Sequence, residues 1–215
     1  MHSAEVPENS IAAFRAALIV GTGIETDLRL SADGVPMIFH DRDVMRLCGS
    51  PAVCSASRAD ELAALRLGGS QERIPRLSDL LELTAGRAPL LLELKSEGNA
   101  ERFAHAVVEQ LHDYSGLVGV MSFDPQVGAW LAVHAPAIRR GLVLPGRPGI
   151  LPRWSGMRRA RPQFLAVKRT RIEQRWVARA RRRMPVYCWT IATADQRAQA
   201  AVKADALIWE ADGRP

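Results

Sequence analysis

The feature of this 215-residue sequence that most limits its fold is a regular alternation of helical and strand-like segments after residue 75. Each amphipathic segment is followed by a short apolar run of the kind found in buried strands. This alternation is typical of a parallel sheet covered by helices, and so many units favour closure into a TIM-type α/β barrel. The expected helices are 77–84, 100–112, 125–134, 154–159, 172–183 and 194–203, and the expected strands are 89–95, 117–123, 141–144, 164–167, 186–191 and 206–209.

One further barrel strand, residues 23–30, precedes this alternation and follows a helix that Asn9 or Ser10 can cap. Counted from this strand the chain supplies seven barrel strands, whereas a closed barrel of this type has eight. Because the chain opens on a helix, the absent strand is the first. We expect a single barrel domain over residues 1–215, with its first strand either encoded upstream of Met1 or lost. The first alternative is preferred, since an open sheet edge invites aggregation.

A hairpin follows the first of these strands. Asp33-Gly34 separates the alternating runs 23–30 and 36–40, and Asp-Gly between two such runs is a strong hairpin signal. A turn centred between Asp33 and Gly34 would place Asp27 opposite His40. The hairpin belongs to a loop-rich insertion at about residues 29–75, in which we expect one short helix near residues 60–65.

Acidic side chains stand on two neighbouring barrel strands. Glu25 and Asp27 are two residues apart on one strand, so their side chains project from the same face of that strand. Glu93 lies near the end of the next barrel strand. We expect the three carboxylates to converge, which requires a cation or a shared proton, and oxygen ligands favour Mg²⁺ or Ca²⁺. Lys95 shares the face of Glu93 and either neutralises an acid or contacts a phosphate. His40 adds a group that exchanges protons near neutral pH.

An ordered set of short motifs along nearly the whole chain resembles the glycerophosphodiester phosphodiesterase family. The motifs are Pro-Glu-Asn-Ser at 7–10, Gly-Ile-Glu-Thr-Asp at 23–27, Ala-Asp-Gly-Val-Pro at 32–36, Phe-His-Asp at 39–41, Ile-Pro-Arg-Leu at 74–77, Glu-Leu-Lys at 93–95, Ser-Phe-Asp-Pro at 122–125 and Trp-Thr at 189–190. Each motif alone is weak, but their order along the chain makes the set specific.

The resemblance implies an eight-stranded α/β barrel that hydrolyses glycerophosphodiesters to glycerol 3-phosphate and an alcohol, a reaction of lipid and glycerol metabolism. It implies that Glu25, Asp27 and Glu93 bind a divalent cation, Mg²⁺ or Ca²⁺, and that His40 is one of two acid–base histidines. Lys95 and Trp189 are expected to contact the substrate, although Trp189 has a core packing role as its alternative. A related lyase that closes a cyclic phosphate on a lysophospholipid or sphingolipid is the alternative enzyme.

The start and the end of the sequence depart from the family pattern. Members begin with a strand ending in His-Arg-Gly, which carries the second catalytic histidine and a phosphate-binding arginine, whereas this sequence begins Met-His-Ser-Ala. Residues 208–210, Ile-Trp-Glu, replace the usual Thr-Asp ending. We expect an in-frame upstream extension that encodes His-Arg-Gly. The alternative is a divergent or inactive homologue that binds phosphate-bearing partners.

The net charge of +6 is unevenly distributed. Residues 139–183 contain fifteen Lys or Arg and a single acid, Glu173. This basic segment is interpreted first as the solvated side of outer barrel helices, with weak contact to anionic membranes as the alternative, and nucleic acid is not an expected partner. The sequence has no apolar run long enough for a membrane span and no signal-peptide pattern. Three cysteines without metal-site spacing are expected to be reduced and packed, which suits a cytoplasmic protein.

Overall fold

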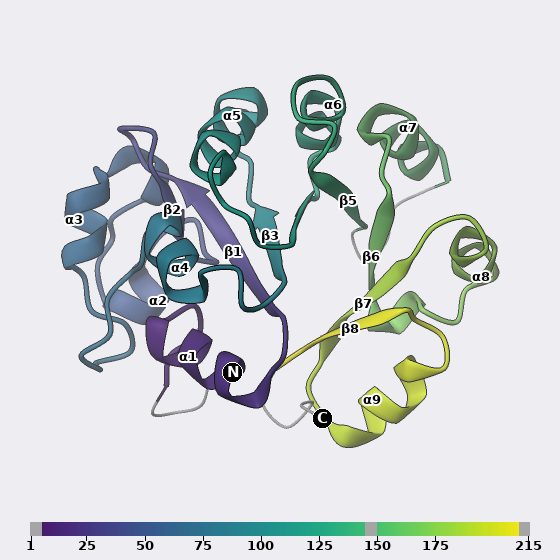
Figure 1. Cartoon of the computed structure of the whole chain (residues 1–215), viewed down its shortest axis with the longest axis horizontal. Coiled ribbons are helices and arrows are strands. Elements are labelled where there is room, and N and C mark those ends of the chain that lie inside the picture. Colours follow the sequence, from purple (N-terminus) through teal and green to yellow (C-terminus); the bar gives the residue numbers. More distant parts are fainter. Residues whose placement is uncertain (1–5, 145–149, 211–215) are drawn as a thin grey trace. The chain divides into compact units, whose positions relative to one another are not determined.

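The computed structural model describes residues 6–144 and 150–210, apart from the side chains of residues 150–153. The chain divides into two compact units, Met1–Val120 and Met121–Pro215. Each unit combines strands with helices in the alternating order expected from the sequence (Figure 1).

The strands of the first unit lie in the order β2-β1-β3-β4. Their bounds are β1 (Ile24–Leu30), β2 (Pro36–Ile38), β3 (Leu90–Leu94) and β4 (Val118–Ser122). The central strand β1 pairs antiparallel with β2 and parallel with β3. In the parallel register Asp27 lies directly beside Glu93, so that two acidic side chains come from neighbouring strands at the same level.

Three helices connect or cover these strands. They are α1 (Ile11–Val20), α4 (Leu77–Thr84) and α5 (Ala100–Leu111), and α1 packs beside α4 (Figure 1). Of the two predicted candidates, Ser10 is the N-cap of α1, because its Oγ accepts a hydrogen bond from the backbone N–H of Ala13 at 3.1 Å. Gly21 ends the helix in the left-handed conformation, with φ +76°, which a glycine adopts without steric cost.

The predicted hairpin is present, but its predicted register is wrong by one residue. Leu28 pairs with Ile38, and the backbone N–H of Phe39, not of His40, donates to the carbonyl of Asp27 at 3.0 Å. The turn is therefore centred on Asp33, whose carboxylate accepts hydrogen bonds from the Ser31 hydroxyl and from the distant Ala59 N–H. These contacts enlarge the turn beyond the two residues that Asp-Gly alone suggests.

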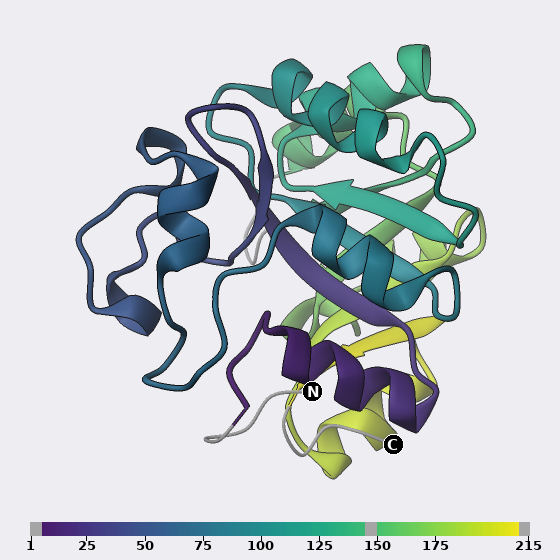
Figure 2. The same ribbon diagram turned by 60° about the vertical axis from the view of Figure 1, so that its left-hand side comes forward.

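The insertion after the hairpin contains more regular structure than the single helix expected. Its elements are α2 (Met45–Cys48), a 3-10 turn at Cys54–Ala56, and α3 (Ala59–Ala64), which lies close to the predicted helix. Figure 2 shows this segment beside the β1–β2 hairpin. Met37, Phe39, Leu62 and Leu67 are fully buried in a core that these elements share. The insertion is thus a packed layer on the hairpin.

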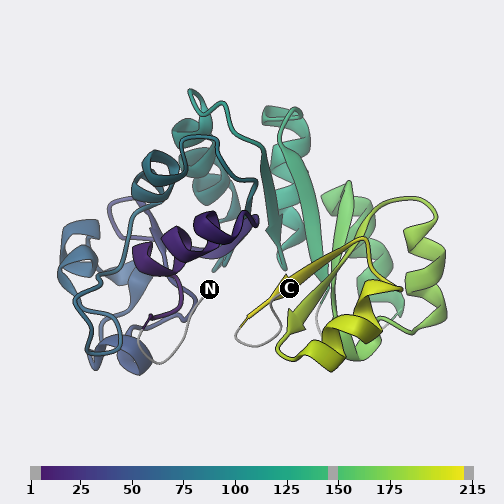
Figure 3. The ribbon, with the colours of Figure 1, turned by 60° about the horizontal axis from the view of Figure 1, so that its bottom comes forward.

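The second unit contains the strands β5 (Arg139–Leu144), β6 (Phe164–Lys168), β7 (Val186–Ile191) and β8 (Ala206–Trp209), in this order and parallel. Its helices are α6 (Pro125–His134), α7 (Ile150–Ala160), α8 (Arg175–Arg181) and α9 (Ala194–Ala201), and α9 lies along β8 (Figure 3). The expected helix 172–183 is shorter in the structure, because residues 172–174 form a turn after the 3-10 helix Arg169–Arg171 and α8 begins only after its N-cap, Gln174.

Two glycines allow close packing in this unit. A Cβ on Gly141 of β5 would lie 2.2 Å from the ring of Phe164 on β6, and a Cβ on Gly128 of α6 would lie 2.7 Å from the carbonyl oxygen of Ala160 on α7. Both contacts are shorter than a side chain tolerates, so only glycine fits at these two positions.

The three cysteines are unpaired, as predicted. Cys54 and Cys188 are buried, and this burial raises the pKa of each thiol to about 11. Thiols of this kind are inert packing groups at neutral pH. Within the described residues, every helix is too short or too polar to span a bilayer.

Candidate active site

The centre of the candidate site is a group of three carboxylates in the first unit. Glu25 and Asp27 project from the same face of β1, and Glu93 projects from the neighbouring strand β3. One oxygen from each of these three residues lies within 4.8 Å of the other two. Glu93 is buried, and the other two acids are partly buried. The sequence prediction that these side chains meet is confirmed, while their role as metal ligands stays a prediction.

Lys95 bridges two of the three acids. Its Nζ lies 3.0 Å from Oδ1 of Asp27 and forms an ion pair with Glu93. Burial lowers the pKa of Lys95, but the carboxylates of Asp27 and Glu93 outweigh this effect and raise it above its ordinary value. Burial also raises the pKa of Glu93, and the nearby ammonium offsets this rise only in part. A single lysine therefore does not balance three acids.

The donor set suits a hard divalent cation. Carboxylate oxygens are the ligands that Mg²⁺ and Ca²⁺ prefer, and three of them meet within one ligand sphere. Oε1 of Glu93 is enclosed by protein and makes no well-directed hydrogen bond, although the Lys95 ammonium lies against it. A buried carboxylate oxygen of this kind needs positive charge beside it, which Lys95 supplies and which a bound cation would also supply.

Asn9 holds the strand that carries two of the acids. Its Nδ2 donates to Oδ2 of Asp27 at 3.2 Å, and its Oδ1 accepts from the buried Thr26 hydroxyl at 2.6 Å. The backbone of Asn9 is left-handed, with φ +56°, which asparagine tolerates better than most residues. The predicted alternative, that Asn9 caps α1, is wrong, because Ser10 takes that position and the Asn9 side chain turns toward β1.

His40 lies two residues beyond the end of β2, and its side chain is half exposed. Its Nδ1 lies 2.7 Å from Oδ1 of Asp41, and Oδ2 of Asp41 accepts from Nε of Arg46 at 2.5 Å. Burial raises the pKa of Asp41, but the hydrogen bonds and charges of Arg46 and His40 together lower it by a larger amount. The pKa of Asp41 is therefore below its ordinary value. His40 also exerts a small electrostatic effect that lowers the pKa of Glu93, against the larger effect of burial. The imidazole is thus held by the ionised Asp41 carboxylate, and its link to the three carboxylates is electrostatic.

Two arginines fix the backbone and the partner of His40. The guanidinium of Arg29 donates two hydrogen bonds to the carbonyl oxygen of His40, from Nε at 3.0 Å and from Nη2 at 2.8 Å. Its Nη1 donates a third hydrogen bond, to Glu97 at 2.6 Å. Arg46 makes a two-pronged contact with Glu8, at 3.1 and 2.5 Å, while it also holds Asp41. Residues from four separate segments therefore position the imidazole.

Trp189 belongs to the second unit, within β7. Its ring meets Phe123 edge-on, with centroids 5.8 Å apart, and Nζ of Lys168 lies 5.9 Å from its centroid. Its indole Nε1 is buried and has no hydrogen-bond partner among the described residues. A buried indole N–H without a partner is uncommon. These contacts leave the predicted substrate role of Trp189 a prediction.

Four residues of this network were not identified as functional from the sequence: Asn9, Arg29, Asp41 and Arg46. Asn9 and Asp41 lie within motifs that the sequence analysis quoted, so the signal was present without its physical role. Arg29 and Arg46 gave no signal, because their partners are recognised only after the chain has folded.

The fold is shared with proteins of known structure. A phosphodiesterase from Oleispira antarctica, solved with the product sn-glycerol-3-phosphate, has a TM-score of 0.85 and 25% identity over 96% of this chain and 89% of its own. A glycerophosphodiester phosphodiesterase from Thermotoga maritima has a TM-score of 0.78 and 23% identity, and the match covers 94% of this chain and 88% of its own. The predicted fold class, the α/β barrel of these phosphodiesterases, is confirmed.

The sequence comparison defines the family. Residues 2–211 match the model of the Glycerophosphoryl diester phosphodiesterase family, and the chain belongs to this family. A glycerophosphodiester phosphodiesterase of Caldanaerobacter subterraneus is 31% identical over 66% of this chain and 63% of its own length. Rat glycerophosphodiester phosphodiesterase 1 is also 31% identical, over 58% of this chain and 41% of its own length. The matches thus span less than two thirds of these relatives.

Proposed function

We propose that this protein is a divalent-cation-dependent phosphodiesterase that hydrolyses glycerophosphodiesters to glycerol 3-phosphate and an alcohol. The observation that carries the proposal is the meeting of Glu25, Asp27 and Glu93 within 4.8 Å, with the Lys95 ammonium against two of them. Family membership and the product-bound relative support the same substrate class. We further propose that the reaction occurs in the cytoplasm.

The three carboxylates would hold the cation, Mg²⁺ or Ca²⁺, because they supply an oxygen-only ligand set with net negative charge. When bound, the cation supplies Lewis-acid polarisation of the phosphate and a template for the substrate hydroxyl. The enclosed position of Glu93 keeps its carboxylate from moving, and the hydrogen bond from Asn9 restrains Asp27 in the same way.

His40 acts in proton transfer. The ionised carboxylate of Asp41, 2.7 Å from Nδ1, favours the tautomer in which Nδ1 carries the proton, so Nε2 is left to accept a proton from a substrate oxygen or to return it. Arg29 fixes the backbone of His40 through two hydrogen bonds to its carbonyl oxygen, which limits the rotation of the residue. General acid–base groups gain their effect from such positioning.

Lys95 is proposed to bind a non-bridging phosphate oxygen of the substrate. Its ammonium lies between the acids and carries a full charge at neutral pH, because its pKa is raised by Asp27 and Glu93. An anionic phosphate gives this charge a partner while the carboxylates engage the cation. Trp189 is retained as a proposed substrate contact, supported by its exposed aromatic neighbour Phe123.

The proposal is tested with purified protein stripped of metal by a chelator and then supplied with Mg²⁺ or Ca²⁺. Glycerophosphocholine and glycerophosphoethanolamine are the substrates, and release of glycerol 3-phosphate is measured with a coupled dehydrogenase. Turnover that depends on the added cation is expected. No metal-dependent turnover of either substrate would contradict the proposal.

The same assay separates hydrolysis from the alternative lyase reaction. A lyase would convert a lysophospholipid or a sphingolipid to a cyclic phosphate, without releasing glycerol 3-phosphate from a glycerophosphodiester. Phosphorus NMR distinguishes a cyclic phosphate from a monoester directly. A cyclic product from lysophosphatidylcholine, with no product from glycerophosphocholine, would favour the lyase.

A further inference from the structure

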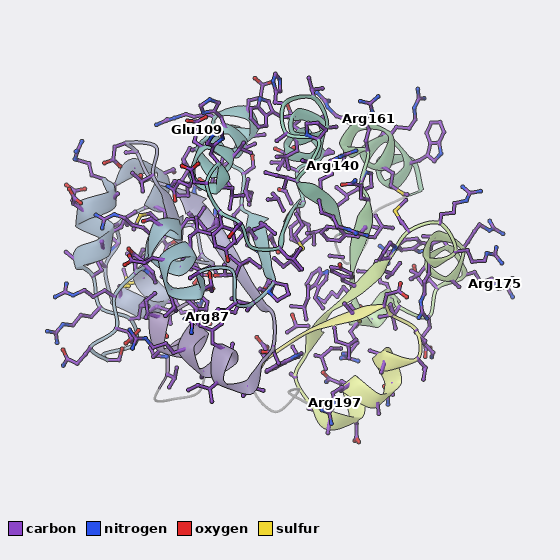
Figure 4. All side chains as sticks on the ribbon, viewed as in Figure 1. Arg87, Glu109, Arg140, Arg161, Arg175 and Arg197 are labelled. Atoms are coloured by element: carbon purple, nitrogen blue, oxygen red, sulfur yellow. The ribbon has the colours of Figure 1, made fainter. Side chains whose placement is uncertain are left out.

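The second unit carries a basic surface that the proposed chemistry does not use. The helices α7 and α8 connect successive parallel strands and lie on the same side of β5–β8 (Figure 1). Seven exposed arginines come from these helices and from the residues directly after them, and Figure 4 shows the labelled Arg175 directed away from the strands. We call this surface the basic face; it consists of Trp154, Arg158, Arg159, Arg161, Arg175, Arg179, Arg182 and Arg183.

Trp154 distinguishes the basic face from an ordinary solvated helix surface. It is 61% exposed on α7, and the guanidinium carbon of Arg158 lies 5.1 Å from the centroid of its ring. A tryptophan that is more than half exposed leaves apolar area unburied. Tryptophan and arginine together are favoured at the boundary between lipid headgroups and acyl chains, where the ring is buried and the guanidinium stays in contact with phosphate.

The basic face also has little acid to neutralise it. The single acidic residue between positions 139 and 183 is Glu173, which forms an ion pair with Lys203. A second acid, Asp205, pairs with Arg181 of α8. Among the described residues, the seven arginines of the basic face form no ion pair, so their charge is available to an anionic partner. A surface with many arginines and almost no acids attracts anionic lipid headgroups, and the attraction weakens as salt screens it.

We propose that the basic face binds the surface of anionic phospholipid membranes, with Trp154 entering the headgroup region. A lipid bilayer is favoured over nucleic acid because the guanidinium of Arg158 already stacks over the Trp154 ring, where a base would have to stack. This association holds whether or not the proposed hydrolysis occurs, because none of these residues belongs to the carboxylate site.

The proposal is tested by cosedimentation of the full chain with sucrose-loaded vesicles. Vesicles of phosphatidylcholine with about a third phosphatidylglycerol are compared with pure phosphatidylcholine in 50 to 300 mM salt. We expect binding to the anionic vesicles alone, decreasing as salt increases. The double variant Arg175→Glu/Arg179→Glu should bind the anionic vesicles about tenfold more weakly or worse.

A matched charge control separates the basic face from net charge. Arg15→Glu/Arg66→Glu changes two exposed arginines in the first unit and lowers the net charge by the same amount, from +6 to +2. This variant should retain most of the binding if the basic face is responsible. Equal losses in both double variants, or no preference for anionic vesicles in the unaltered protein, would overturn the proposal.

Trp154 gives an independent readout of membrane contact. Tryptophan emission should shift to shorter wavelength when anionic vesicles are added, and most of this shift should disappear in Trp154→Phe. Circular dichroism checks that each variant keeps its fold. Tighter binding to double- or single-stranded DNA than to anionic vesicles at the same salt concentration would assign the face to nucleic acid and reject the membrane proposal.

Discussion

The ammonium of Lys95 lies 3.0 Å from Oδ1 of Asp27, and the same ammonium forms an ion pair with Glu93. One lysine therefore contacts two of the three acids proposed to bind a cation. In the absence of a cation the lysine reduces the repulsion between these carboxylates, and in its presence the two positive charges repel each other. From this relationship we predict that metal affinity and phosphate binding are linked.

Lys95→Met is predicted to bind the divalent cation more tightly and the substrate more weakly. Removal of the ammonium takes away a competing positive charge, so the Kd for Mg²⁺ or Ca²⁺, measured by calorimetry, should fall by about three- to tenfold. The KM for glycerophosphocholine should rise, because the phosphate loses a partner. A rise in KM together with weaker cation binding would show instead that Lys95 mainly organises the acids.

Glu93→Gln is predicted to abolish metal-dependent activity with little loss of fold. Glutamine is nearly isosteric but removes one of three anionic ligands, and a hard cation depends strongly on ligand charge. Cation affinity should fall by roughly tenfold or more, while the circular dichroism spectrum stays unchanged. Glu82→Gln, at an exposed position on α4, is the control. Wild-type cation affinity in Glu93→Gln would refute the ligand assignment.

Asp41→Asn is predicted to lower kcat while cation affinity stays the same. The amide does not stabilise a positive imidazole or hold the Nδ1–H tautomer of His40 as the carboxylate does, so kcat should fall roughly 10- to 1000-fold. The pH profile of kcat should move as well, which a purely structural defect would not cause. Asp113→Asn, at a side chain that is 99% exposed, is the control. An unchanged pH profile would argue against the positioning role of Asp41.

Asn9→Ala is predicted to weaken cation binding through Asp27 and to destabilise the first unit. The substitution removes the donor to Asp27 and leaves the buried Thr26 hydroxyl without its acceptor, a loss of about 1–3 kcal/mol. Alanine also tolerates the left-handed backbone less well than asparagine. Urea unfolding and cation titration measure the two effects. Equal cation affinity in the variant and the wild type would limit Asn9 to a structural role.

Asp205→Asn is predicted to destabilise the protein at neutral pH but not in acid. Asp205 accepts from the backbone N–H of Val186 at 2.8 Å and from Arg181 at 2.9 Å; burial raises its pKa, but these two donors lower it overall. Because the pKa of Asp205 is lower in the folded than in the unfolded protein, its ionised carboxylate stabilises the fold at pH values above the unfolded pKa of about 4. This stabilisation is lost as the pH falls through the folded pKa.

The expected difference in unfolding free energy between wild type and Asp205→Asn is about 1 kcal/mol at pH 7, reduced by the partial exposure of the pair. It should shrink toward zero as pH falls below about 4. Thermal unfolding across pH 3 to 7 measures it. A difference that is the same at every pH would mean that packing, and not charge, is the property of Asp205 that matters.

The sequence by itself determined most of the secondary structure and the grouping of the acids. The helices 77–84 and 125–134 and the strands 186–191 and 206–209 agree with the structure residue for residue, because apolar periodicity and capping residues act locally. Glu25, Asp27 and Glu93 could be grouped because strand alternation and parallel pairing follow simple rules of side-chain direction.

Only the tertiary structure decided how the site is supported. The hairpin register depends on the bond from Ala59 N–H to Asp33, which crosses 26 positions of sequence, and Arg29 reaches the carbonyl of His40 across 11. Asn9 binds Thr26 and Asp27 instead of capping α1. Local sequence preferences do not decide these hydrogen-bond partners. Burial and the need to satisfy polar groups decide them, and both arise only once distant segments are packed together.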